Sequence, residues 1–87
     1  MNYRKKFLEL TNKFPNKSLY SCLGMLIELK RIGHVLNKHS GCLAEDFRDA
    51  FPNSAIKPEG TRYCSFLLKG KKLSDCSKED IANALID

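Results

Sequence analysis

Residues 18–33, SLYSCLGMLIELKRIG, predict a helix around which the rest of the chain packs. On a helical projection at about 100° per residue, apolar side chains cover more than half of the circumference of this stretch. A helix that is apolar on most sides is buried at the centre of its domain, so the rest of the chain has to pack around it. Ser18 predicts the N-cap, and Gly33 predicts a left-handed residue that ends the helix after Ile32. The apolar positions are Leu19, Cys22, Leu23, Met25, Leu26, Ile27, Leu29 and Ile32.

A second helix is predicted on the amino-terminal side, over residues 2–13. Its apolar residues share one helical stripe, while basic residues fan around the remaining faces. The helix is expected to end beside Pro15, because the residue before a proline avoids the helical region. The stripe consists of Tyr3, Phe7, Leu10 and Phe14.

On the carboxyl-terminal side, the pattern predicts a third helix and then a hairpin. The helix covers residues 42–51 and stops at Pro52. Two strands follow, over 54–57 and 61–68, with a turn at 58–60 between them. Between the second and third helices, Val35 and Leu36 either continue the preceding helix or form a short strand, and residues 37–41 are expected to form a turn.

The last predicted element is a helix over residues 78–86. Ser77 and Asp80 have the spacing of a capping box at its amino-terminal end, and Ile81 and Leu85 form its buried edge. Gly70 turns the chain before this helix and has lysines on both sides.

The resulting order is α-α-α-β-β-α in a single domain that spans residues 1–87, a helix-dominated α+β fold. This order resembles that of a winged-helix domain, with three helices, a hairpin wing and a trailing helix. The resemblance concerns element order only, and many small α+β domains share it.

Composition excludes several classes of protein. The chain has 87 residues, of which 43% are hydrophobic and 29% charged, a balance that is typical of a globular domain and not of a disordered chain. No apolar run approaches the roughly 18–20 residues of a membrane span, so no membrane association is expected. Glu9, Thr11 and Asn12 interrupt the apolar run that an export signal would need, and the cytoplasm is the expected compartment.

The positive charge falls in two blocks. Lys and Arg number 15 against 10 acidic residues, which gives a net charge of +5 and a pI near 9.1. Residues 1–17 and 57–72 hold most of this excess, whereas 40–56 and 73–87 are acidic. If the two basic blocks meet on one face, their combined field attracts a polyanion.

The helix before the hairpin argues against the usual winged-helix contact with DNA. It carries Glu45, Asp46 and Asp49 against Arg48, and carboxylates facing phosphates repel them. The sequence therefore predicts that the hairpin and the first helix bind nucleic acid, most simply DNA. The candidate residues are Arg4, Lys5, Lys6, Lys13, Lys57, Arg62, Tyr63, Lys69, Lys71 and Lys72.

No catalytic, cofactor or metal site is predicted. The phosphate-binding and dinucleotide motifs are absent, and nothing singles out a Cys–His nucleophile pair. His39 and Cys42 with the distant Cys64 and Cys76 lack the two tight ligand pairs of a structural zinc site. All four cysteines, including Cys22, are expected to be reduced thiols that pack as small hydrophobic side chains.

Two functions are compatible with these features. The first is a small, non-enzymatic nucleic-acid-binding regulator, for example of transcription. The second is an inhibitor, immunity or accessory factor of the kind that phages and plasmids encode, which docks on an acidic surface of a larger host protein. In that case Glu45, Asp46 and Asp49 beside Phe51 become candidate contacts. Homodimerisation through the apolar excess of residues 19–32 is compatible with either function.

Overall fold

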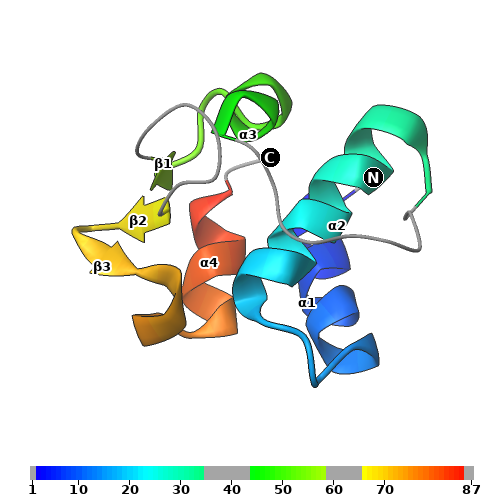
Figure 1. The fold of residues 1–87 in the computed structure, drawn as a ribbon, viewed down its shortest axis with the longest axis horizontal. Helices are drawn as coiled ribbons and strands as arrows, with labels where there is room; N and C mark the ends of the chain where they lie inside the picture. Colours follow the sequence, from blue (N-terminus) through cyan, green and yellow to red (C-terminus); the bar gives the residue numbers. More distant parts are fainter. Residues whose placement is uncertain (1, 35–43, 59–65, 86–87) are drawn as a thin grey trace.

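The computed structural model describes residues 2–34, 44–58 and 66–85. These residues form four α-helices, a three-stranded antiparallel sheet and one 3-10 helix, so the fold is helix-dominated α+β as predicted (Figure 1). The winged-helix resemblance stays a prediction. The elements are α1 (Tyr3–Lys13), α2 (Leu19–Ile32), α3 (Ala44–Ala50), β1 (Lys57–Pro58), β2 (Phe66–Leu68), β3 (Lys71–Lys72), η1 (Leu73–Asp75) and α4 (Lys78–Ala84).

The bounds of α2 agree with the prediction because both caps form. The backbone N–H of Ser21 donates to the Ser18 side-chain oxygen at 3.0 Å. At the other end, Gly33 has a φ of 83° and donates its N–H to the carbonyl of Leu29. A glycine adopts this left-handed conformation without the steric cost that a Cβ atom brings.

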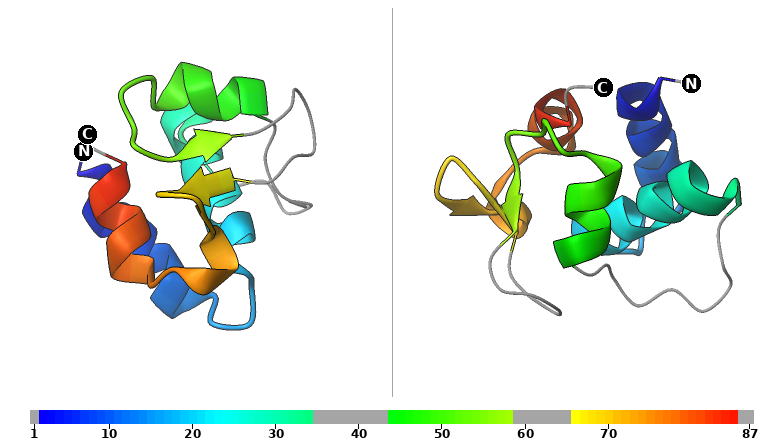
Figure 2. Two further views of the ribbon diagram at one scale, coloured as in Figure 1. Left: turned by 90° about the vertical axis from the view of Figure 1, so that its left-hand side faces the viewer. Right: turned by 90° about the horizontal axis from the view of Figure 1, so that it is seen from above.

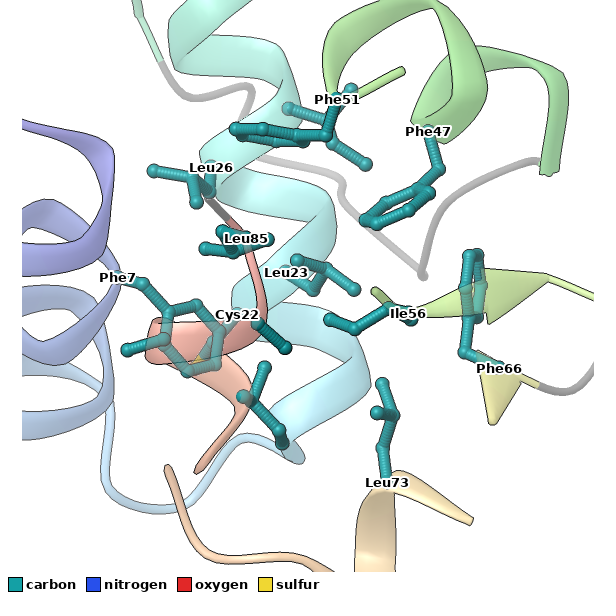
Figure 3. Close-up of a cluster of buried hydrophobic side chains, with 14 of the residues drawn as sticks. Phe7, Cys22, Leu23, Leu26, Phe47, Phe51, Ile56, Phe66, Leu73 and Leu85 are labelled. Carbon is teal, nitrogen blue, oxygen red and sulfur yellow. The ribbon is translucent and has the colours of Figure 1, made fainter. Parts of the chain in front are cut away.

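The first two-thirds of α2 form the centre of the core. All six residues from Cys22 to Ile27 are buried, and the other elements pack around them (Figures 1 and 3). In Figure 3, Leu23 and Leu26 lie among side chains contributed by α1, α3 and α4. Each fully buried Leu of this kind contributes about 1.5–3 kcal/mol of hydrophobic stabilisation.

The last turn of α2 differs from the prediction. Leu29 is half-buried and Ile32 is 51% exposed, so the carboxyl-terminal end of the helix is not enclosed. The reason is geometric: α4 and the sheet lie toward the amino-terminal part of α2, and its last turn extends beyond them (Figure 1).

Aromatic side chains join the sheet to the helices. Phe66 of β2 packs against Tyr20 of α2 and Phe47 of α3, with ring centroids 5.3 Å apart in each pair. Phe51 lies 5.7 Å from Phe47 and is 3% exposed. The Phe51 ring beside the acidic residues of α3 is therefore part of the core.

The two predicted strands pair antiparallel, but the first is shorter than expected. Only Lys57 and Pro58 form β1, and Lys57 lies opposite Leu67 of β2. Of the predicted second strand, Phe66–Leu68 is β2 and residues 61–65 lie outside the described residues. The sequence did not indicate β3, which adds a third strand at the other edge of β2.

Residues 54–56 bind the last helix instead of a neighbouring strand. The Ser54 hydroxyl donates to the carbonyl of Ala84 at 2.7 Å, and the N–H of Ala55 donates to the same oxygen at 2.9 Å. The Ser54 oxygen in turn accepts from the buried N–H of Ile56 at 3.1 Å. These bonds use the groups that a longer strand would need for pairing, which explains the short β1.

The terminal helices agree with the predicted boundaries within the described residues. The Ser77 side chain accepts from the N–H of Asp80 at 3.1 Å, so Ser77 is the N-cap of α4 as expected. Ile81 and Leu85 are fully buried, and α4 packs against α1. None of the helices in the described segments is long and apolar enough to cross a membrane.

We expect Ser54→Ala to lower the free energy of unfolding by about 1–3 kcal/mol, because it leaves the buried N–H of Ile56 without its acceptor. Urea denaturation followed by circular dichroism measures this loss. Ser74→Ala, at an exposed position of η1, is the matched control and should change stability by less than about 0.5 kcal/mol. Equal stability of the two variants would contradict a structural role for the Ser54 hydroxyl.

Candidate nucleic-acid interface

The sheet presents a row of two lysines with a leucine between them. Lys57 on β1 and Lys72 on β3 both lie directly opposite Leu67 of β2. Directly opposed residues of an antiparallel pair lie on the same face, so all three side chains share one face of the sheet. Phe66 and Leu68 point to the opposite face and are buried, which makes the lysine row the outer face.

Two further lysines flank the tight turn between β2 and β3. Lys69 and Gly70 have φ values of 53° and 78°, the pair of positive angles that defines a type I′ turn. Such turns favour Asn-Gly, and a lysine in the left-handed region costs about 1 kcal/mol. Lys71 follows as the first residue of β3.

These four lysines form what we call the sheet cluster: Lys57, Lys69, Lys71 and Lys72. All four are exposed, and none of their ammonium groups makes an ion pair or a hydrogen bond with another described residue. Their mutual repulsion is therefore compensated by solvent or by a ligand.

The cations of α1 are in part engaged locally. Lys6 pairs with Glu9 at 3.4 Å, and the ammonium of Lys13 lies 5.5 Å from the centre of the Phe14 ring. Arg4 and Lys5 are exposed on the first turn of the helix. The predicted interface on α1 therefore has fewer cations without a local contact than the sheet cluster has.

The last helix separates the two basic surfaces. In Figure 1, α4 lies between α1 and the β2–β3 turn, and the view from above in Figure 2 places the three elements in the same order. The ammonium of Lys78 on α4 donates to the Asn12 side chain on α1 at 3.1 Å. Glu79 and Asp80 are exposed on α4. The structure therefore does not join the two blocks into one continuous surface.

Other cations hold helices together. The Lys30 ammonium donates to the carbonyl of Ala50 at the end of α3 and lies 5.0 Å and 4.4 Å from the ring centres of Tyr3 and Phe51. A cation at a helix carboxyl end and over aromatic faces is favourable on both counts. Lys30 consequently belongs to the scaffold.

The acidic helix α3 is anchored by both neighbours. Arg31 of α2 pairs with Asp46 at 2.9 Å, and Arg48 donates to the carbonyl of Pro58 at 3.2 Å. These contacts give Asp46 a structural partner, and they orient α3 against α2 and β1.

A cavity of about 540 Å³ lies between the sheet cluster and α4. Its size falls in the range of about 300–1,000 Å³ that is typical of small-molecule sites. In the sequence, the only signal of this site is the spacing of Asp80 and Asn83, which places them on one helical face. The lining includes Leu68, Lys69, Lys71, Cys76, Asp80 and Asn83.

The two cysteines within the described residues are free thiols. Cys22 is in the core as expected, and burial raises the pKa of its thiol. Cys76 is half-buried and donates its S–H to the carbonyl of Lys72 at 3.3 Å.

Several candidate residues fall outside the described part of the chain: Arg62, Tyr63, His39, Cys42 and Cys64. The contacts predicted for Arg62 and Tyr63 and the zinc ligands that the sequence argument rejected therefore stay untested. Among the residues that are described, no group of three or more potential metal ligands comes together.

Comparison with known proteins gives no match: no family model fits the chain, and no curated protein or solved structure is significantly similar to it.

We expect Lys69→Asn to raise the free energy of unfolding by about 1 kcal/mol, because asparagine tolerates the positive φ at this turn position better than lysine does. Urea denaturation of the variant and the parent measures the gain. Lys71→Asn removes the same charge from a regular strand position and should give no gain. If the two variants are equally stable, strain at Lys69 is not the cause.

Proposed function

We propose that this protein binds the phosphate backbone of a nucleic acid through the sheet cluster. One observation supports this most directly: four exposed lysines without partners among the described residues gather on one small sheet. Lysines near phosphates displace condensed counterions, and this release favours binding without any base-specific contact.

The arrangement of the strands suits such a contact. Lys57 and Lys72 lie on the outer face of the sheet, and Lys69 lies in the exposed turn. Lys71 pairs with Leu68 and lies on the other face, on the side of α4. A projecting basic hairpin can follow a groove or a single strand. Arg62 and Tyr63, which lie between β1 and β2 in the sequence, are proposed to add a phosphate contact and a base-stacking contact.

The cations of α1 are proposed to make a separate and weaker contact. Because α4 lies between α1 and the sheet, one nucleic acid must pass over α4 to reach both surfaces. Glu79 and Asp80 disfavour a close approach of phosphate along that path.

A second candidate function is docking on an acidic surface of another protein. The half-buried Leu67 between Lys57 and Lys72 favours it, because protein interfaces combine an apolar centre with a polar rim. This candidate predicts no salt-dependent retention on nucleic acid.

We expect the protein to bind both a labelled duplex and a labelled single strand, with affinity that falls steeply as salt increases. In the variant Lys57→Gln/Lys72→Gln, the slope of log Kd against log salt should fall by about 1.8 for the duplex and about 1.4 for the single strand, since two phosphate contacts are lost. Fluorescence anisotropy over a salt series measures the affinity and the slope.

The matched control is Arg4→Gln/Lys5→Gln, which removes the same charge from the far side of α4. It should retain most of the affinity and of the slope. The proposal is contradicted if the parent protein binds neither probe at low salt, or if the sheet variant binds as well as the parent.

A further inference from the structure

The cavity between the sheet cluster and α4 carries opposite charges on opposite walls. Lys69 and Lys71 line it from the β2–β3 turn, while Asp80 and Asn83 line it from α4. All four residues are exposed, and none of their side chains pairs with another described residue. Two lysines and a carboxylate thus share one cavity without neutralising each other.

This separation defines the chemistry of a ligand that fits. The lysine wall offers only hydrogen-bond donors and positive charge, so it requires an anionic group. The Asp80 carboxylate only accepts, so the opposite wall requires hydrogen-bond donors, and the Asn83 amide can both donate and accept. Leu68, with Ala55 and Ala84, supplies an apolar surface between the two walls.

We infer that this cavity binds one guanine nucleotide, with its phosphate at Lys69 and Lys71 and its base edge at Asp80 and Asn83. This inference builds on the proposed nucleic-acid binding, for which it supplies a site for an unpaired nucleotide. Guanine presents two adjacent donors, N1–H and the exocyclic N2 amine, and these match the two oxygens of one carboxylate. Proteins that recognise unpaired nucleotides read such base edges by hydrogen bonds, and pockets for flipped bases hold the base between aromatic or apolar side chains.

The size of the cavity favours a nucleotide over a smaller zwitterion. An amino acid also combines an anionic and a donor group, but it would fill only a small part of about 540 Å³.

The experiment is a titration of the isotopically labelled full chain with GMP, IMP, AMP and guanosine, followed by amide chemical shifts. We expect GMP to bind about tenfold or more tightly than IMP, which lacks the N2 amine, because the lost hydrogen bond involves a charged acceptor. Guanosine, without a phosphate, should bind more weakly than GMP. The shifts should concentrate at residues 68–71, 76, 80 and 83.

Two variants test which wall of the cavity binds the base and which binds the phosphate. Asp80→Asn should abolish the preference for GMP over IMP, and Lys71→Gln should weaken all the nucleotides by similar factors. Both positions are exposed, and circular dichroism verifies that the variants fold. The inference is overturned if Asp80→Asn keeps the preference, if guanosine binds as well as GMP, or if glycine produces the cavity shifts and GMP does not.

The outcome is separable from that of the proposed function. Lys57→Gln/Lys72→Gln leaves the cavity lining intact and should not change GMP affinity, whereas Asp80→Asn should not reduce the salt slope for long probes. GMP selectivity without salt-dependent binding of long probes would refute the sheet contact alone. Salt-dependent binding without GMP selectivity would refute the nucleotide site alone.

Discussion

The core of this protein is organised around the buried helix α2. Its six buried residues from Cys22 to Ile27 cannot be covered by one neighbour, so α1, α3 and the element η1 contact it from different directions. A chain of this size buries a smaller fraction of its surface than a large domain does, and a single continuous core then has to supply most of its stability. The position of every functional side chain follows from how the other elements enclose this helix.

The enclosing elements also divide the surface. Packing α4 against α1 buries Ile81 and Leu85, and it places a helix with exposed carboxylates between the two basic surfaces. The same helix forms one wall of the cavity whose other wall is the lysine turn. The packing of α4 against α1 therefore prevents the two basic surfaces from forming one continuous cationic face. It also creates the cavity that combines the lysines of the turn with the carboxylate of Asp80.

The sequence predicts the helices well because their signals are local. Ser18, Gly33 and Ser77 cap helices through bonds to residues within four positions, and no tertiary contact is needed to identify them. The sheet is predicted less well: β3 has only two residues, both lysines, and its pairing with β2 depends on the backbone geometry of the turn. The bonds from Ser54 and Ala55 to Ala84 cross about a third of the chain, and no periodicity indicates them.

The candidate site was also predicted in part: its lysines are visible in the sequence, but their arrangement relative to α4 is not. Charge counting identified Lys57, Lys69, Lys71 and Lys72, because a run of lysines is visible in any sequence. It could not show that α4 separates them from the cations of α1, since this depends on helix packing. Asp80 was recognised only as part of a cap, and Asn83 was not recognised at all, because their opposition to the turn exists only in three dimensions.

The shared oxygen of Ala84 has a consequence for how the protein is made. Ser54 and Ala55 find their acceptor in the last turn of α4, thirty residues further along the chain in the case of Ser54. During translation, Ser54 and Ala55 can form these hydrogen bonds only after the last turn of α4 has left the ribosome. The domain is therefore expected to finish folding late, as one cooperative event, and not to accumulate stable structure from its amino-terminal end.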